Sequence, residues 1–173
     1  MISSIYLSHN KYNDSALLVK PQNRVSFTGS NKLISPTNAN LQNSLGAENI
    51  ALLNKIRLIG KANGQETYLV GGAVRDCLLG KKPSDLDVMI NGDALEFPKT
   101  LMREDGKTFK KIHLKNLVKR SVVYTDKMSI DIVPLKEDGS RVIDGVALKK
   151  ALAENAKHRD YTVNTMFIQL GED

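Results

Sequence analysis

Two short stretches near the middle of the chain decide the fold. Residues 68–80 read Tyr-Leu-Val-Gly-Gly-Ala-Val-Arg-Asp-Cys-Leu-Leu-Gly, and residues 85–90 read Asp-Leu-Asp-Val-Met-Ile. The first predicts a buried strand over 67–70, a glycine break and a short helix over 73–79 that ends at a glycine. The second predicts another strand, which Asn91-Gly92 ends. This order of elements is typical of a mixed α/β domain.

The glycine pair has a second implication, because it stands between a strand and a helix. Without a Cβ, Gly71 and Gly72 let backbone N–H groups approach an anion, and the following helix N-terminus adds a favourable dipole. Arg75 carries a guanidinium suited to phosphate oxygens, and Asp76 is placed either to orient it or to cap backbone groups. We therefore predict a triphosphate-binding turn. An ordinary tight turn with a surface ion pair is the alternative.

Two carboxylates open the second strand. Asp85 and Asp87 are two residues apart, which places both on one face of a sheet. Like charges held together are unfavourable unless a cation joins them, and carboxylate oxygens suit Mg²⁺. The following residues 88–90 are apolar, which favours a metal site over a solvated strand end. Two such ions, about 3.5–4 Å apart, can activate an attacking hydroxyl and stabilise a departing pyrophosphate.

A third carboxylate, Asp131, lies within the apolar run 129–134. A charge among apolar strand residues is costly unless it is compensated. Asp131 is therefore a candidate third catalytic carboxylate, contributed by a neighbouring strand. Its alternation with Ile130 and Ile132 also permits a charge that simply faces solvent.

The second informative stretch is residues 158–164, His-Arg-Asp-Tyr-Thr-Val-Asn, which follows a predicted helix over 146–157. Arg159 is suited to pair with phosphate. Asp160 and Asn164 are suited to bond ribose hydroxyls or to fix the loop. A helix C-terminus with a basic residue explains the same pattern, so this stretch alone is unspecific.

Together, the two stretches resemble motifs of the bacterial-type (class II) tRNA CCA-adding enzymes and poly(A) polymerases, which belong to the DNA polymerase beta-like nucleotidyltransferases. The resemblance covers about residues 65–170, and both motifs in this order are more specific than either alone. It implies an α/β (α+β) head domain with a small mixed sheet and helices packed on one side. It also implies template-independent transfer of AMP or CMP to an RNA 3′-hydroxyl, with tRNA as the expected RNA and Mg²⁺ as cofactor.

By this resemblance, Gly72 and Arg75 would bind the triphosphate of ATP or CTP. Asp85 and Asp87 would bind Mg²⁺, and Arg159 would bind the incoming nucleotide.

The sequence also departs from the family pattern. His158 stands where the family usually has an arginine. The chain ends at Asp173, before the helical neck that selects the nucleotide and the body and tail domains that grip tRNA. Two alternatives therefore stay open: an inactive head or one that needs a partner chain to supply neck and body, and a transferase acting on a protein or small molecule.

Length and composition predict a head domain over 47–173, beginning with a helix at Ala47, and a polar leader over 1–46. The leader is rich in Ser and Asn, and we expect it to be disordered apart from a possible strand over 25–29. We also expect a helix over 95–103 and paired strands over 120–125 and 128–134. The single cysteine, Cys77, excludes an internal disulfide, and no apolar run is long enough to span a membrane. With no secretory signal, these features predict a cytoplasmic protein.

The net charge of +6 suits an RNA or nucleotide partner. Positive side chains gather between residues 99 and 120: Lys99, Arg103, Lys107, Lys110, Lys111, Lys115, Lys119 and Arg120. This run fits contact with an RNA backbone, and a flexible, solvated loop is its alternative.

Overall fold

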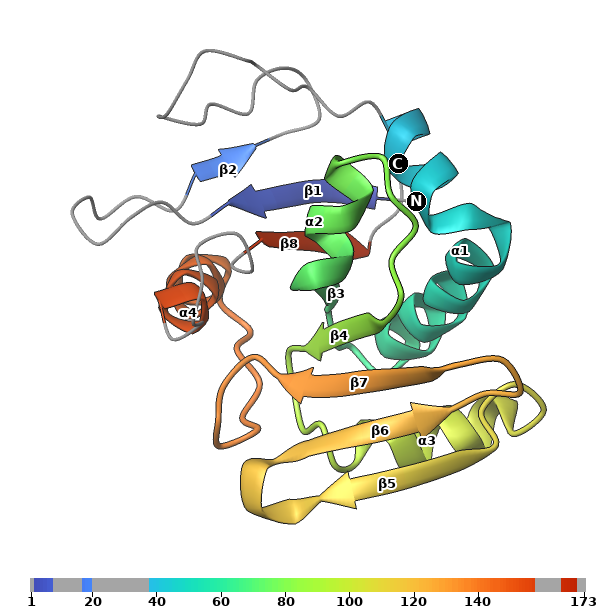
Figure 1. Cartoon of the computed structure of the whole chain (residues 1–173). Helices are drawn as coiled ribbons and strands as arrows, with labels where there is room; N and C mark the ends of the chain where they lie inside the picture. Colours follow the sequence, from blue (N-terminus) through green and yellow to red (C-terminus); the bar gives the residue numbers. More distant parts are fainter. Residues whose placement is uncertain (1, 8–16, 20–37, 158–165, 171–173) are drawn as a thin grey trace, which may run out of the picture.

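One eight-stranded sheet runs through the part of the chain that the computed structural model describes, residues 2–7, 17–19, 38–157 and 166–170. The strand order is β2-β1-β8-β3-β4-β7-β6-β5 (Figure 1). Strands β4 and β7 pair in parallel, and the other neighbours pair antiparallel. The elements are β1 (Ile2–Leu7), β2 (Leu17–Val19), α1 (Asn38–Ala62), β3 (Thr67–Val70), α2 (Gly72–Leu78), β4 (Leu86–Ile90), α3 (Phe97–Asp105), β5 (Lys111–Lys115), the 3₁₀ helix η1 (Asn116–Val118), β6 (Arg120–Tyr124), β7 (Ser129–Pro134), α4 (Gly145–Lys157) and β8 (Met166–Leu170).

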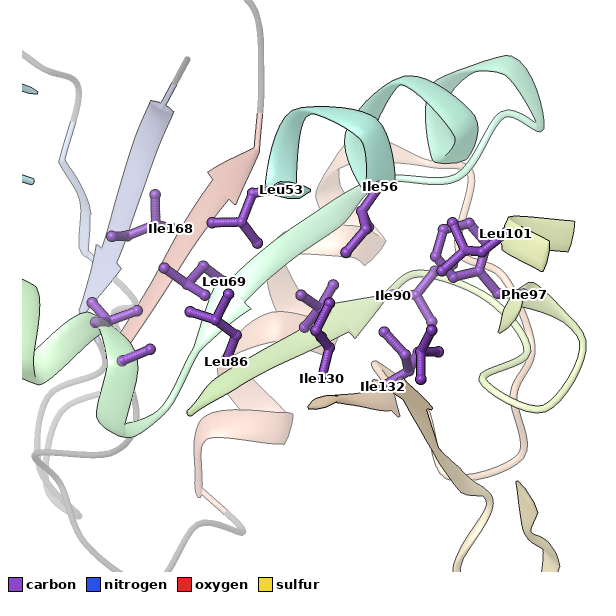
Figure 2. Packing of buried hydrophobic residues seen from close by; sticks show 14 of the residues in the cluster. Leu53, Ile56, Leu69, Leu86, Ile90, Phe97, Leu101, Ile130, Ile132 and Ile168 are labelled. Atoms are coloured by element: carbon purple, nitrogen blue, oxygen red, sulfur yellow. The ribbon is translucent and has the colours of Figure 1, made fainter. Parts of the chain in front are cut away.

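The main core lies on one face of the sheet. Helices α1, α2 and α3 pack there against alternate residues of the central strands, among them Leu69, Val88 and Ile130. Figure 2 shows Leu53 and Ile56 of α1 together with Leu69 and Ile130 of the sheet. It also shows Leu101 of α3 beside Ile90. The expected mixed α/β class is confirmed by this arrangement.

One helix departs from the expected packing on a single side. Helix α4 lies on the opposite face, where Leu152 and Ala156 join Tyr68, Val70 and Phe167 in a second apolar cluster. The cause is the alternation of the strands, since β3 and β8 are apolar on both faces and need cover on each. No helix in the described ranges is long and apolar enough to cross a membrane.

The leader differs from the disordered segment expected for residues 1–46. Strand β1 pairs with β8, and β2 pairs with β1, so part of the leader extends the sheet. The two strands are mostly apolar, Ile-Ser-Ser-Ile-Tyr-Leu and Leu-Leu-Val, and their pairing covers the backbone groups that β8 would otherwise expose along its edge. The possible strand at 25–29 lies outside the described residues.

Helix α1 begins at Asn38, before the predicted start at Ala47. Gly46 interrupts it with φ 76° and ψ 156°, so the helical pattern read from Ala47 corresponds to the part after this kink. The expected paired strands are confirmed as β6 and β7. The basic run 99–120 is not one loop, because α3, β5 and η1 lie within it.

Candidate functional site

The turn from β3 into α2 is built on glycine. Gly71 has φ 71° and ψ −142°, a backbone conformation that is costly for any residue with a Cβ. A Cβ on Gly72 would lie 3.4 Å from Nη2 of Arg75. Strand β3 is buried along its whole length between β8 and β4, so the turn follows directly from the end of a central strand.

Arg75 and Asp76 form an ion pair beside this turn. Both Nε and Nη2 of Arg75 lie 2.8 Å from Oδ1 of Asp76. The hydrogen bond and the carboxylate charge raise the pKa of the Arg75 guanidinium. The predicted pairing of these two side chains is therefore present, and it holds the guanidinium close to Gly72. Their part in nucleotide binding stays a prediction.

Asp87 and Asp131 are brought together by the parallel strands β4 and β7, whose register pairs them directly. Paired residues of neighbouring strands point to the same face, with their backbones about 4.8 Å apart. Both side chains are half-buried and line the same pocket. Asp131 lies beside Asp87, as the first alternative expected, and its side chain is also 48% exposed to solvent, as the second expected. Its catalytic role stays a prediction.

Asp85 is placed differently from these two. It lies one residue before β4, is exposed, and accepts a hydrogen bond from Ser84 Oγ at 2.8 Å. Within the described ranges, no three His, Cys, Asp or Glu side chains are close enough together to hold a metal ion. The register thus pairs Asp87 with Asp131, whereas Asp85 lies just outside the strand. The predicted role of Asp85 and Asp87 in metal binding stays a prediction.

The donor set still fits Mg²⁺. This ion prefers oxygen ligands, keeps several waters, and is commonly held by one or two carboxylates together with substrate phosphates. Asp87 and Asp131 offer two such carboxylates on adjacent strands, at a pocket with room for phosphates.

The pocket has a volume of about 910 Å³, which lies within the range of small-molecule sites. Gly71 and Gly72 form one part of its wall, and the β4 and β7 carboxylates form another. The opposite rim is the tip between β5 and β6, residues 117–120. The pocket thus brings the predicted glycine turn, Asp87 and Asp131 together with a segment that was predicted only to be basic.

None of the four rim residues of this tip, residues 117–120, was predicted as a site residue. Lys119 has φ 51°, in the left-handed region, and Leu117 is fully exposed at 102%. Asn155 of α4 was also missed, although it lines the pocket and donates a hydrogen bond to the Leu135 carbonyl at 2.8 Å. Among these missed residues, only Lys119 and Arg120 belonged to a sequence prediction, because they are part of the basic run 99–120. The predicted nucleotide-binding residues Arg159, Asp160 and Asn164 lie outside the described residues.

Solved structures share this arrangement of strands and helices. A CCA-adding enzyme in complex with ATP has a TM-score of 0.65 and 25% identity, over 78% of this chain and 30% of that one. The Thermotoga maritima CCA-adding enzyme complexed with tRNA has a TM-score of 0.60 and 25% identity, over 77% of this chain and 29% of that one. The chain therefore has the fold of the head domain of these nucleotidyltransferases.

Sequence comparison names the family. Residues 67–173 match the family described as the Poly A polymerase head domain, and the chain belongs to this family. A Geobacter sulfurreducens A-adding tRNA nucleotidyltransferase is 27% identical over 72% of this chain and 14% of its own length. A Geobacillus kaustophilus CCA-adding enzyme is 31% identical over 61% of this chain and 26% of its own length. The chain thus spans about a quarter or less of these two curated relatives.

Proposed function

We propose that this chain is the catalytic head of a template-independent RNA nucleotidyltransferase. It transfers AMP or CMP from ATP or CTP to the 3′-hydroxyl of an RNA, with tRNA as the expected acceptor. The observation that carries the proposal is the register pairing of Asp87 with Asp131 in a pocket walled by Gly71 and Gly72. The choice of RNA is supported by the relatives, which are named as tRNA nucleotidyltransferases, CCA-adding enzymes and poly(A) polymerases.

The glycine turn receives the triphosphate. Backbone N–H groups at Gly71 and Gly72 approach the phosphates without a side chain in the way. Arg75, oriented by Asp76 at 2.8 Å, adds positive charge beside the turn. Arg159, Asp160 and Asn164 remain proposed contacts to the nucleotide.

The carboxylates Asp85, Asp87 and Asp131 would hold Mg²⁺. When bound, the metal supplies positive charge that lowers the pKa of the attacking hydroxyl and neutralises the leaving pyrophosphate. In the reaction, the RNA 3′-hydroxyl loses its proton to solvent and its oxygen bonds to the α-phosphorus. The bond from the α-phosphorus to the oxygen that bridges to the β-phosphate breaks, and pyrophosphate leaves. The protein contributes mainly by positioning the two substrates and by charge placed in advance, with Arg75 near the departing pyrophosphate.

A second candidate is favoured by the short span of the chain relative to its relatives. In it, the head binds nucleotide and Mg²⁺ but transfers only with a partner chain that supplies neck and body domains. A protein or small molecule as acceptor is the remaining alternative, because the fold does not fix the substrate.

The test is transfer of α-labelled ATP and CTP, assayed separately, onto tRNA that ends at the discriminator base or at CC. An Asp85→Ala Asp87→Ala variant should lose the label in RNA. Asp126→Ala is the matched control, because Asp126 is an exposed carboxylate in the β6–β7 turn, away from the pocket. ATP binding without transfer supports the partner-dependent head, and label in protein instead of RNA overturns the choice of acceptor. Equal transfer by the double variant would refute the assignment of the carboxylates.

A further inference from the structure

The face of the sheet that carries the carboxylates continues across β6 and β5. The register pairs Asp131 with Val122, and Val122 with His113, so these three residues share one face. The neighbouring pair Lys115 and Arg120 shares it as well. Two contacts agree with this placement. Lys115 Nζ lies 4.0 Å from Asp131 Oδ1, and Lys111 Nζ lies 5.8 Å from the centre of the Tyr124 ring.

This face is positive and open beyond the pocket. We call it the basic surface, and it consists of five exposed side chains: Lys111, His113, Lys115, Lys119 and Arg120. No Asp or Glu occurs between residues 110 and 124. Its inner end, Lys119 and Arg120, lines the pocket. Its outer end lies on β5, the last strand of the sheet on that side (Figure 1).

The other cations of the run 99–120 lie elsewhere. Lys99 and Arg103 are on α3, which packs on the opposite face of the sheet, and they pair with Glu96 and Glu104. Lys107 lines a separate pocket next to α1, and Lys110 pairs with Asp126 at 3.9 Å. The fold therefore divides one basic run of sequence into a part on the carboxylate face and a part on the helix-covered face.

The size of the basic surface suits several phosphates. Alternate residues of a strand are about 6.8 Å apart, so the row from Lys111 to Lys115 extends about 14 Å. A nucleic acid strand carries several negative charges over such a length. Lysines spaced along a strand bind phosphates without reading bases, which suits an acceptor that varies in sequence.

We propose that the basic surface binds the backbone phosphates of the RNA acceptor, upstream of its 3′ end. The inference rests on the proposed function, because the 3′-hydroxyl must reach Asp87 and Asp131 for transfer. From the pocket, the RNA strand passes Arg120 at the rim and continues along β5, past Lys115 to Lys111. The surface is thereby a substrate-positioning element for RNA, separate from the glycine turn that receives the triphosphate.

The test compares two double variants of the full chain, each with two positive charges removed. Lys111→Gln Lys115→Gln changes no residue that lines the pocket, but it removes the ion pair between Lys115 and Asp131. Lys111→Gln alone is therefore measured beside it, because this variant keeps that ion pair. Lys99→Gln Arg103→Gln is the control on the opposite face. The probe is a 5′-fluorescein RNA hairpin with a single-stranded 3′ end, and binding is measured by anisotropy between about 50 and 200 mM salt.

The basic-surface variant should bind the probe roughly tenfold more weakly than the unmodified chain. The slope of log affinity against log salt should fall by about 1.4, because each lost contact to a single strand removes about 0.7. The control should change neither quantity, and a Lys111→Arg Lys115→Arg variant should restore both. Thermal unfolding checks that each variant folds. Should the double variant fail to fold, Lys111→Gln alone is expected to lower the slope by about 0.7.

The possible outcomes separate the inference from the function that it rests on. Equal loss of RNA affinity in both double variants, or no binding of RNA by the unmodified chain, overturns the inference. The inference is also overturned if the basic-surface variant loses as much affinity for ATP as for RNA. The cations would then bind the triphosphate. If the chain transfers no nucleotide but only the basic-surface variant loses RNA affinity, the inference stands and the proposed catalysis is wrong.

Discussion

Asn91 and Val142 are joined by two hydrogen bonds between segments that are distant in sequence. Asn91 Nδ2 donates to the Val142 carbonyl at 2.7 Å, and the Val142 N–H donates to Asn91 Oδ1 at 2.8 Å. Nδ2 also donates to Glu66 Oε2 at 2.6 Å, and Asn91 is fully buried. Two residues after Val142, Asp144 caps α4 by accepting from the Val146 and Ala147 N–H groups. The amide at the end of β4 thus fixes the loop that places α4 at the pocket.

Replacement of Asn91 by alanine should lower the free energy of unfolding by about 2–3 kcal/mol. The cause is the loss of buried hydrogen bonds that leaves the Val142 backbone groups without their partner. Chemical denaturation measures the change, with Asn116→Ala, an exposed asparagine in η1, as the control. A loss no larger than that of the control would show that water replaces the amide without cost.

Asp131→Asn should reduce nucleotide transfer on the order of a hundredfold or more, because a neutral amide stabilises a bound cation far less than a carboxylate. Its stability should change little, since the removal of repulsion from Asp87 is offset by the loss of an exposed ion pair with Lys115. Single-turnover transfer and thermal unfolding measure the two effects on the same samples, and Asp126→Asn serves as the control. Transfer within a few-fold of the unmodified chain would remove Asp131 from the catalytic set.

The centre of the fold was predictable because its signals are local. Strand β3, the glycine turn, α2 and β4 follow from short apolar runs and from two glycines, one of which has φ 71°. The Arg75 and Asp76 pair is also a local feature, formed between sequence neighbours. Such features depend on few distant contacts, so a single sequence contains them.

The rest of the fold and of the site depends on pairing between segments that are distant in sequence. The alternation Lys-Ile-His-Leu-Lys of β5 is short, and its polar positions merge with the basic run around it. The placement of Asp131 depends on the register of β7 against β4, since a shift by one residue would turn it to the other face. For the same reason, the division of the basic run into two faces could not be predicted before β5, β6 and α3 were placed.

Gly71→Ala should destabilise the chain by about 1–3 kcal/mol and weaken ATP binding, because φ 71° with ψ −142° is strained for a residue with a Cβ. Gly72→Ala is the matched variant. Its added Cβ meets the end of the flexible Arg75 side chain at 3.4 Å, so stability should change little. Thermal unfolding and ATP titration of both variants measure these effects. Equal destabilisation by the two substitutions would contradict the assignment of the strain to Gly71.

The Cys77 thiol should be almost unreactive in the folded chain. Burial, with a smaller effect from the Asp76 charge, raises its pKa from 9.0 to about 11. At pH 8 the thiolate population of the folded chain is therefore about a hundredfold below that of an exposed cysteine. Iodoacetamide labelling followed by mass spectrometry should show slow modification of the native chain and fast modification in denaturant.

The same shift predicts how stability depends on pH. The unfolded chain releases the thiol proton near pH 9, whereas the folded chain keeps it to about pH 11. The contribution of Cys77 to stability is therefore complete below pH 9 and is lost as the pH rises from 9 towards 11. Cys77→Ala removes the titrating group, so its unfolding free energy should fall less steeply over this range than that of the unmodified chain. Parallel curves for the two proteins, or rapid alkylation of the native thiol at pH 8, would show that Cys77 is accessible and that its pKa is close to the ordinary value.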